Sequence, residues 1–541
     1  LDTSTVPIEP VRDGNGQIMT VSIPVADKSI TAEIWLAKVG RCDLLLLNLC
    51  EPHADGAMVR EFRLYGGDKT TRIVQELALG VGGYRALQKL GIRPGVFHLN
   101  EGHCAFALLE AIAERMEATG LGFRQCAEDL AEQTVFTTHT PVAAGHDWFE
   151  PGLLLHHLRP LQRRLGLSDY ELMALGRVNP DDSSHEFCMT VLALKLANRA
   201  NAVSSLHAIV SRRMWQTLWS ARRTNEVPIG HITNGVHVDT WLAYELAALY
   251  DDCLGADWRN RLCDVQRWRL IDTLDAFQLW STKVALKQRM ISFIQRRLAQ
   301  RQTRLGRSET LPALRSDVLT IGFARRIAPY KRVCLMFEDF ERAKRLFTDP
   351  LRPVQIIFAG KAHPADEPSK GLLRQLYEFA QSPELRDHVV FIEDYDKNVS
   401  RHLLEGCDLW LNGPRRPLEA CGTSGMKAVF NATLNCSTLD GWWDEAYDTR
   451  NGFAFGDGLV HQDLMQQDRH DAASLLALLE DKVVPLFYDR DEQQVPLGWL
   501  RMVKHALKTL AWQYNADRMV MNYTRNMYLP ASRTLTTSFE D

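Results

Sequence analysis

The sequence predicts an α/β protein built from more than one domain, each with a parallel sheet. Short β-branched or apolar runs that end in polar or glycine residues recur, and each precedes a helical pattern. Strands that alternate with helices are typical of parallel sheets covered by helices on both faces. The 541 residues exceed what one hydrophobic core accommodates, and 45% hydrophobic with 24% charged residues is ordinary for a globular protein.

The predicted strands are spread along most of the chain. They are expected at 43–48, 95–100, 134–138, 202–205, 318–323, 354–360, 389–392 and 408–412. The opening stretch also alternates in the manner of a β-strand. The run Gly80-Val81-Gly82-Gly83 lies inside a helical pattern and not between a strand and a helix, so close helix packing explains it better than a dinucleotide fingerprint.

The chain is expected to divide at two points. Residues 1–235 are predicted to form a partial N-terminal α/β domain, and residues 236–490 a second α/β domain that opens with long amphipathic helices at 241–302. A polar connector is expected at 300–309. The tail at 491–541 is predicted to be helical.

Charge and cysteine content exclude several classes of protein. The formal net charge of -4 gives no reason to expect nucleic acid or a membrane as a partner, whereas a neutral polysaccharide is compatible with it. Eleven cysteines without a CxxC pair indicate reduced thiols rather than a disulfide framework or a zinc ribbon, and no metal site is expected. The sequence has no 18-residue apolar stretch and no signal-peptide layout, so a cytoplasmic location is predicted.

The segment PLEACGTSGMK, residues 417–427, places Lys427 just after a short turn of Gly, Ser and Thr. Such a turn directs backbone N–H groups and hydroxyls toward an anion, which suits a phosphate. A lysine there can be a solvated residue at a helix start, a counter-ion, or an amine that binds a phosphorylated aldehyde cofactor covalently. The turn alone leaves these readings open.

A basic cluster follows the strand predicted at 318–323. It contains Arg325, Arg326, Lys331 and Arg332, with Pro329 interrupting the run. A surface charge run is the plain explanation. Four cations at the carboxyl end of a core strand also suit two oxyanions held close together, because arginine offers a bidentate fork and lysine a compact charge.

Polar residues follow two earlier strands. Asn100, Glu101 and His103 come after one, and His139 follows the next within a Thr-rich loop. In open α/β sheets ligands gather beyond the carboxyl ends of the strands, so these residues are candidates for a binding site. A buried histidine is otherwise more often structural. The pair Trp442-Trp443 is explained equally well by sugar stacking and by core packing.

Five segments, in one order, resemble the α-glucan phosphorylases, in particular the bacterial short type. They are FHLNEGH (97–103), FTTHTP (136–141), ITNG (232–235), GFARRIAPYKR (322–332) and RRPLEACGTSGMKAVFNATLNCSTLDGWWD (415–444). The resemblance implies two Rossmann-like domains that face a cleft, the GT-B architecture of glycosyltransferases. Compared with that family, the start of the N-terminal domain, with its glycine-rich loop, is expected to be absent.

The resemblance implies pyridoxal 5′-phosphate bound to Lys427. Thr423, Ser424 and Gly425 would hold the cofactor phosphate, with Lys331, Arg325 and Tyr395 nearby, although Tyr395 is equally explained as a packed aromatic. Arg326 would bind the substrate phosphate and Lys331 would contact both phosphates. The glucan would be bound by Asn100, Glu101, His103, His139, Asn234 and Glu419. Lys427, Arg326, Lys331 and His139 are the expected catalytic residues.

The implied reaction is retaining phosphorolysis of an α-1,4-glucan. Glycogen, starch or maltodextrin plus inorganic phosphate would give glucose 1-phosphate, with the cofactor phosphate as a proton relay and a homodimer as the working unit. The alternatives are a nucleotide-sugar glycosyltransferase such as a glycogen synthase, which does not need Lys427 in this motif, and a catalytically inactive glucan-binding homologue. On this reading, residues 1–235 form the glucan side, 236–490 the cofactor side, and 491–541 return to the first domain.

Overall fold

The computed structural model describes residues 6–50, 68–307, 310–364 and 366–532. These residues divide into two compact units. Unit 1 comprises Leu1–Val203, Ala208–His231 and Tyr523–Asp541, and unit 2 comprises Ser204–His207 and Ile232–Asn522.

Unit 1 contains two main sheets. An antiparallel sheet is formed by β1 (Ile8–Pro10), β2 (Thr20–Val25), β3 (Lys28–Val39) and β4 (Cys42–Cys50). A parallel sheet has the order β10-β9-β6-β5, with β5 at Phe97–Asn100, β6 at Thr134–Thr137, β9 at Arg199–Ala202 and β10 at Ile229–His231. A short antiparallel pair joins β7 (Trp148–Phe149) to β8 (Phe187–Cys188).

Helices surround the parallel sheet of unit 1. They are α1 (Lys69–Leu77), α2 (Gly83–Lys89), α3 (Phe106–Thr119), α4 (Phe123–Glu132), α5 (Pro151–Leu165), α6 (Asp169–Gly176), α7 (Met189–Leu196), most of α8 (Ser205–Trp215) and α22 (Leu529–Ala531). The C-terminal segment also contacts the parallel sheet through side chains, since His98 Nδ1 lies 2.7 Å from the Tyr528 hydroxyl.

Two strand predictions in unit 1 need correction. The run at 43–48 is a strand, but β4 pairs antiparallel with β3 over nine residue pairs and does not join the parallel sheet. A hairpin connection, with no helix between the two strands, accounts for the difference. The run at 202–205 is displaced: β9 ends at Ala202 and α8 already begins at Ser205.

The prediction for Gly80-Val81-Gly82-Gly83 is confirmed. This run falls in a π-helical turn, Ala78–Gly82, continuous with α1 and α2. A Cβ atom on Gly80 would lie 2.8 Å from the backbone nitrogen of Ala107, and one on Gly82 would lie 2.7 Å from Ile23 Cδ1. The glycines therefore permit helix and sheet to approach closely, and no dinucleotide turn is formed.

Unit 2 is built on a six-stranded parallel sheet with the order β13-β12-β11-β14-β15-β16. The strands are β11 (Leu319–Ala324), β12 (Val354–Ala359), β13 (Val389–Ile392), β14 (Leu409–Asn412), β15 (Leu434–Thr438) and β16 (Phe453–Phe455). Counted along the chain from β11, this is the 3-2-1-4-5-6 order of a Rossmann sheet. The predicted fold class, α/β with Rossmann-like parallel sheets, is confirmed.

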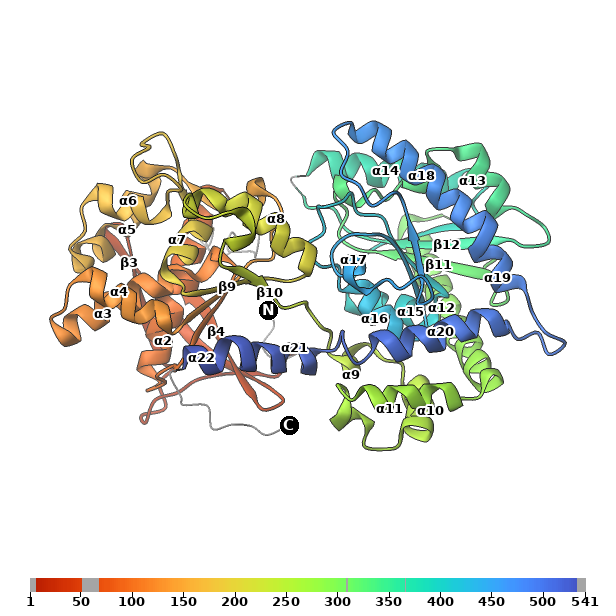
Figure 1. Ribbon diagram of the computed structural model, residues 1–541, viewed down its shortest axis with the longest axis horizontal. Helices are drawn as coiled ribbons and strands as arrows, with labels where there is room; N and C mark the ends of the chain where they lie inside the picture. The colour runs from red at the N-terminus through yellow and green to blue at the C-terminus, as the bar shows by residue number, and fades with distance from the viewer. Residues whose placement is uncertain (1–5, 51–67, 308–309, 365, 533–541) are drawn as a thin grey trace. The chain divides into compact units, whose positions relative to one another are not determined.

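Helices cover both faces of this sheet, with α13 and α14 on one side and α12, α15, α16 and α20 on the other (Figure 1). The bounds are α9 (Val238–Trp241), α10 (Tyr244–Leu254), α11 (Val265–Arg269), α12 (Ala276–Leu305), α13 (Phe340–Phe347), α14 (Glu367–Gln381), α15 (Lys397–Gly406), α16 (Ser424–Phe430), α17 (Trp443–Ala446), α18 (Leu464–Leu478), α19 (Val484–Tyr488), α20 (Leu497–Leu510) and most of α21 (Ala516–Tyr523).

The helix α12 runs further than the sequence predicts. Asp275 caps its start by accepting a hydrogen bond from the backbone N–H of Gln278, and Gly306 ends it in the left-handed conformation. Residues 300–305 of the connector predicted at 300–309 are therefore helical. Residues 308 and 309 lie outside the described residues.

The strand order of unit 2 determines where a ligand can bind. The chain leaves β11 toward β12 on one side and returns to β14 on the other, and in open α/β sheets ligands bind beyond the carboxyl ends of the strands at such a point. Arg325 directly follows β11, and Asn412 ends β14. The sequence motifs for an anion site lie on the loops that follow these two strands.

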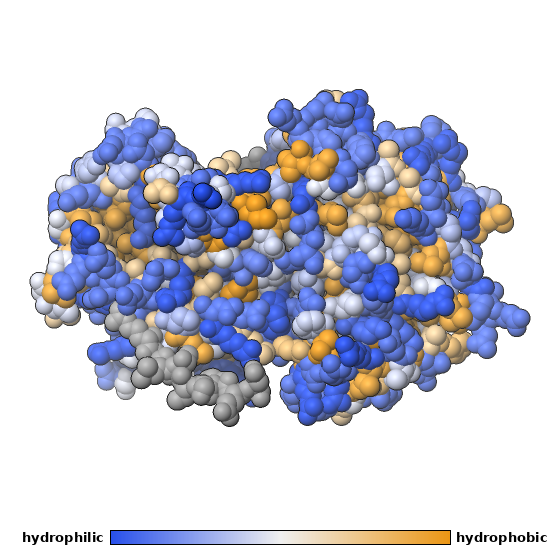
Figure 2. Space-filling model, viewed as in Figure 1, coloured by the Kyte–Doolittle hydropathy of each residue, from blue (hydrophilic) through white to orange (hydrophobic). Residues whose placement is uncertain are grey.

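The face shown in Figure 2 is mostly hydrophilic, with small separate apolar patches. Within the described ranges, every helix is too short or too polar to span a bilayer. Ten of the eleven cysteines have described side chains; these are free thiols, and six of them are buried.

Candidate functional site

The loops beyond β11 and β14 are joined by a network of amide and hydroxyl groups. A guanidinium N–H of Arg325 donates to Asn412 Oδ1, and the hydroxyl of Ser424 donates to the same oxygen over 3.1 Å. Asn412 Nδ2 donates in turn to Asn435 Oδ1 on β15, 3.0 Å away. This network fixes the start of α16 against the edge of the sheet.

A single carboxylate holds two of the predicted cations together. Lys331 Nζ lies 2.8 Å and Arg325 Nη1 3.4 Å from Glu419 Oε2, and all three side chains are at most 13% exposed. Burial, reinforced by Arg325, lowers the pKa of Lys331 to about 8. Burial would raise the pKa of Glu419, but the charges of Lys331 and Arg325 outweigh it and lower that pKa. Glu419 thus neutralises two cations that would otherwise attract an anion.

The basic cluster predicted at 325–332 divides into three parts. Arg325 and Lys331 pair with Glu419. Arg332 is buried and pairs with Asp471 at 2.7 Å and Asp468 at 3.0 Å, so its role is structural. Arg326 is exposed, and its guanidinium makes no hydrogen bond or ion pair with a described residue. Arg326 is therefore available to an incoming oxyanion.

Lys427 lies in α16, one turn after the Gly-Thr-Ser sequence. Its ammonium is 3.8 Å from the centroid of the Trp241 ring and has no hydrogen bond or ion pair to any described side chain. Burial lowers the pKa of Lys427 to about 8, with a smaller contribution from the charge of Lys397. Near neutral pH an appreciable fraction of this amine is unprotonated and nucleophilic.

Gly425 is required by close packing. A Cβ atom there would lie 2.4 Å from Asn435 Oδ1 and 2.9 Å from Trp442. The turn can therefore approach β15 only with glycine at this position. Pyridoxal 5′-phosphate needs an amine for its aldehyde and polar or cationic groups for its phosphate. The amine of Lys427 pairs with no described residue, and the tight turn has Thr423 and Ser424 half-buried. Together with the cations Arg325, Arg326 and Lys331 in the loop after β11, these groups fit the cofactor.

Two further predicted residues of unit 2 lie in defined surroundings. The Tyr395 hydroxyl lies 3.3 Å from Ser400 Oγ and 3.5 Å from the Ala324 carbonyl, and the ring packs against a hydrophobic cluster. Asn234 is half-buried, and its carbonyl accepts a hydrogen bond from Arg518. Their predicted roles stay predictions. Trp442 and Trp443 are 2% and 0% exposed, which favours core packing over sugar stacking.

In unit 1, Glu101 organises the loop that carries His139. Its Oε1 accepts hydrogen bonds from the backbone N–H of His139 and from the hydroxyls of Thr140, at 2.9 Å, and Thr138, at 3.4 Å. Glu101 has φ +68°, a left-handed value that strains a residue other than glycine. The hydrogen bonds therefore hold a strained residue that joins the ends of neighbouring strands β5 and β6.

The other predicted residues of unit 1 differ in their surroundings. Asn100 is exposed at the end of β5. The His139 ring is partly buried, and burial lowers the pKa of its imidazole. His103 Nδ1 lies 2.8 Å from Asp147 and 2.7 Å from Arg72. The structure thus brings Asn100, Glu101 and His139 to the same edge of one sheet, as predicted for neighbouring strands.

Two clusters bring together groups that ligate metals elsewhere, although no sequence spacing predicted them. They are Glu76, His103 and Asp147 in unit 1, and Asp457, His470 and Asp471 in unit 2. Arginine already pairs with each: Arg72 with Asp147 at 3.0 Å and Arg332 with Asp471 at 2.7 Å. The charge that a cation would supply is thus already supplied by an arginine in each cluster.

Several site residues were missed by sequence reasoning. Asn412 could have been found, because it ends a predicted strand at the carboxyl edge of the sheet. Trp241 could not, because it is remote in sequence from Lys427. Asn431, Asn435 and Asp440 lie inside the segment 415–444, but their side-chain partners come from other parts of the chain or from its folded turns, so the segment does not reveal their contacts.

Comparisons with known proteins agree on one family. The family model described as carbohydrate phosphorylase matches residues 84–478. A maltodextrin phosphorylase of Thermococcus litoralis is 40% identical over 97% of this chain and 62% of its own length. A glycogen phosphorylase of Mycobacterium tuberculosis is 40% identical over 99% of this chain and 63% of its length, and one of Aquifex aeolicus is 37% identical over 97% and 75%. The chain thus spans about three fifths of the length of the first two relatives.

Proposed function

We propose a phosphorolytic activity on the premise that this chain belongs to the carbohydrate phosphorylase family. The proposed reaction cleaves an α-1,4-glucan with inorganic phosphate and releases glucose 1-phosphate with retention of configuration. The relatives that are named glycogen and maltodextrin phosphorylases support a glucan as substrate.

The loops of unit 2 are proposed to hold pyridoxal 5′-phosphate. Lys427 would bind it covalently, while Thr423, Ser424 and Gly425 would donate hydrogen bonds to its phosphate and Lys331 and Arg325 would balance the charge. When bound, this group supplies a phosphate whose second pKa lies near neutrality and which can exchange a proton. Tyr395 is proposed to lie beside it.

The substrate phosphate is assigned to Arg326 and Lys331. The support is the exposed guanidinium of Arg326, which has no partner among the described residues, and the position of Lys331. Lys331 can exchange its partner Glu419 for an oxyanion. Two phosphates a few Å apart repel each other by several kcal/mol at an effective dielectric constant of about 20, so this concentration of positive charge is needed. Glu419, once released, would accept hydrogen bonds from sugar hydroxyls.

The polar groups of unit 1 are proposed to bind the glucan. His139 would donate a hydrogen bond to a glucosyl hydroxyl from a loop that Glu101 holds in place, with Asn100 exposed beside it. His103 is proposed to line the same edge, and Asn234 of unit 2 to bind a further hydroxyl. Neutral donors and acceptors suit an uncharged sugar.

The single observation that carries the proposal is the unpaired Lys427 amine beside a turn and a set of cations. The test is incubation of the full chain with maltodextrin and phosphate, with release of glucose 1-phosphate measured, before and after borohydride treatment. We expect activity together with a reducible chromophore that maps to the peptide containing Lys427. Lys427→Ala should abolish both, and Lys344→Ala on the surface of α13 should change neither. Phosphorolysis retained in Lys427→Ala would refute the proposal.

The same assay separates the alternatives. A chain that binds maltodextrin but releases no glucose 1-phosphate with the chromophore present would be a glucan-binding homologue. Transfer from a nucleotide sugar without a reducible chromophore would indicate a synthase. The expected homodimer and cytoplasmic location stay predictions, and sedimentation of the full chain tests the first.

A further inference from the structure

Two residues far from Lys427 in sequence define its surroundings within unit 2. The ring of Trp241, at the end of α9, lies under the Lys427 ammonium. Asn431, which follows α16, is fully buried and uses its whole side-chain amide. Its Oδ1 accepts from the backbone N–H of Ala243 over 2.9 Å, while Nδ2 donates to the carbonyls of Trp241, at 2.8 Å, and Lys427, at 3.1 Å.

The side-chain amide of Asn431 therefore links the backbone of Trp241 to the backbone of Lys427. Trp241 and Lys427 are 186 positions apart, yet the carbonyl of each accepts a hydrogen bond from the same NH₂ group. The Trp241 ring also packs against the hydrophobic cluster around Met290 and Ala428. Packing thereby holds the ring, and a hydrogen bond holds the backbone that carries it.

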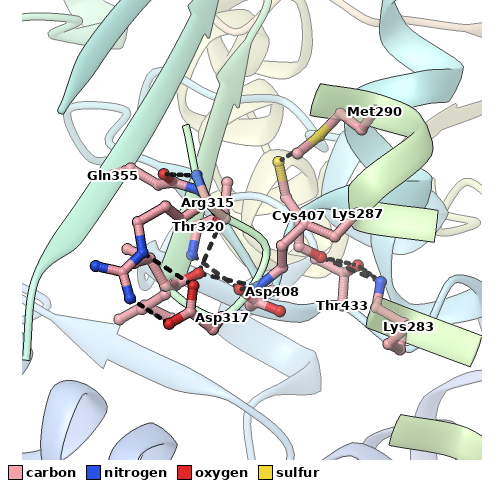
Figure 3. Close-up of polar contacts among 12 residues, drawn as sticks. Lys283, Lys287, Met290, Arg315, Asp317, Thr320, Gln355, Cys407, Asp408 and Thr433 are labelled. Atoms are coloured by element: carbon pink, nitrogen blue, oxygen red, sulfur yellow. Dashed lines mark hydrogen bonds and ion pairs between the residues drawn. The ribbon is translucent and has the colours of Figure 1, made fainter. Parts of the chain in front are cut away.

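Asn431 is itself anchored from beneath by a buried lysine. Lys283 of α12 donates to the carbonyls of Asn431, at 2.8 Å, Glu405, at 2.8 Å, and Cys407, at 3.1 Å, and to the Thr433 hydroxyl, at 3.0 Å. Figure 3 shows the Lys283 ammonium directed at Thr433. Lys283 is 3% exposed, so solvent does not compete for these hydrogen bonds.

We propose that Trp241 and Asn431 are positioning residues for Lys427: the ring fixes where the ammonium lies, and the amide fixes the ring relative to the helix that carries the lysine. This inference rests on the proposed function, because it concerns the amine that would bind pyridoxal 5′-phosphate. An ammonium over a tryptophan face is attracted by the ring quadrupole without forming the ion pair that would hold it charged and unreactive. The ring therefore holds the Lys427 amine in position and leaves it able to react.

The charged groups on the neighbouring helices are accounted for. On α15 Lys397 acts on Lys427 by charge, whereas on α9 Asp239 pairs with Arg259 at 3.2 Å. On α20 His505 pairs with Asp448 and Lys508 with Asp272. A change in the titration of Lys427 after substitution of Trp241 would therefore be assigned to the ring.

The test follows the amine in two independent ways. First, the full chain is treated with a small acylating ester from pH 6 to 11, and acylation of the Lys427 peptide is quantified by mass spectrometry. Second, pyridoxal 5′-phosphate is added to the cofactor-free chain, and its covalent attachment is followed by absorbance. The variants are Trp241→Leu, Trp241→Phe and Asn431→Asp, with Trp499→Phe and Asn451→Ala as controls for loss of a buried tryptophan and a buried asparagine.

We expect Trp241→Leu to lower the acylation midpoint by about half a pH unit or more. Attachment of the cofactor should slow at least about fivefold, because the amine is no longer held in place. Trp241→Phe should restore part of both effects, and Asn431→Asp, which loses the NH₂ donor to the two carbonyls, should reproduce the slower attachment. The two control variants should behave as the wild type.

A midpoint that is unchanged or raised in Trp241→Leu, with a wild-type rate of attachment, would overturn the inference. If Trp241→Leu does not fold, the same criterion applies to Trp241→Phe. If the wild-type chain attaches no cofactor, the proposed function fails, whereas the acylation profile still decides whether Trp241 and Asn431 position Lys427.

Discussion

Glu101 of unit 1 and Glu419 of unit 2 are the same residue type in the same kind of place, a loop that follows a parallel strand, yet their surroundings differ. Glu101 accepts hydrogen bonds from a backbone N–H and two hydroxyls, all neutral donors. Glu419 pairs with two cations, Lys331 and Arg325. The first carboxylate holds a loop, and the second balances charge.

This difference extends to the two sheet edges. At the edge of unit 1 the charged side chains Arg72, His103 and Asp147 are paired with one another, which leaves neutral groups to meet a ligand. At the edge of unit 2 Arg326 has no partner among the described residues, and Lys331 shares its partner with Arg325. The contrast suits an uncharged sugar at one edge and phosphates at the other.

Breaking the buried ion pair between Lys287 and Asp408, which lies in unit 2, should have the largest effect on stability. Lys287 and Asp408, each 1% exposed, form an ion pair at 2.5 Å beneath β14, and Asp408 also accepts from the N–H of Thr320 (Figure 3). Asp408→Ala should lower the free energy of unfolding by about 3–5 kcal/mol, because it leaves a buried ammonium unpaired. Urea denaturation of the full chain measures this. Adding Lys287→Met should recover much of the loss. A loss under about 1 kcal/mol in Asp408→Ala would show that the ion pair does not stabilise this part of the fold.

Removal of the Glu101 carboxylate should have the next largest effect. Glu101→Ala leaves the His139 N–H and two hydroxyls without their acceptor, so we expect a loss of about 2–3 kcal/mol in unfolding free energy. Glu101→Gln, which keeps an acceptor oxygen, should lose about 1 kcal/mol. Glu128→Ala, on the exposed face of α4, is the control. Equal, small losses in all three variants would mean that Glu101 does not hold the loop.

Glu419→Gln should raise the affinity for anions. With their carboxylate replaced by a neutral amide, Lys331 and Arg325 should bind inorganic phosphate roughly threefold to tenfold more tightly. Isothermal calorimetry with phosphate measures this, and Glu101→Gln should show no gain. A weaker affinity in Glu419→Gln would mean that the carboxylate orders the cations rather than neutralising them.

A further difference between wild type and variant should appear as a pH slope. Burial, opposed by hydrogen bonds from the backbone N–H of Glu419 and reinforced by the Glu419 charge, raises the pKa of Asp440 from 3.8 to about 8. The unfolded chain therefore loses this proton first, and the contribution of Asp440 to stability is lost as pH rises from about 4 to 8. Asp440→Asn, which does not titrate, should lose less stability than wild type between pH 5 and 9. Parallel urea-midpoint profiles for the two proteins would show that Asp440 titrates normally.

Much of the fold could be predicted because its signals are local. Apolar runs that end in polar residues placed β5, β6, β11, β12, β13 and β14 to within a few residues. The strands β15 and β16 were missed, since Leu434–Thr438 and Phe453–Phe455 are short and lie inside or just beyond a motif-rich segment. The run at 43–48 was assigned to the wrong kind of sheet, because an apolar run does not reveal whether its partner is parallel.

The sequence by itself determined the chemistry available: an ordered set of motifs, a lysine after a tight turn, cations after a strand, and polar loops after two others. Only the tertiary structure decided how that chemistry is divided. It paired Arg332 with Asp471 and left Arg326 free, gave Glu101 neutral donors and Glu419 cations, and brought Trp241 and Asn431 to Lys427. Hydrogen bonds and ion pairs form between atoms that are close in space, and residues such as Trp241 and Lys427, 186 positions apart in the chain, become neighbours only when the sheet and its helices have packed.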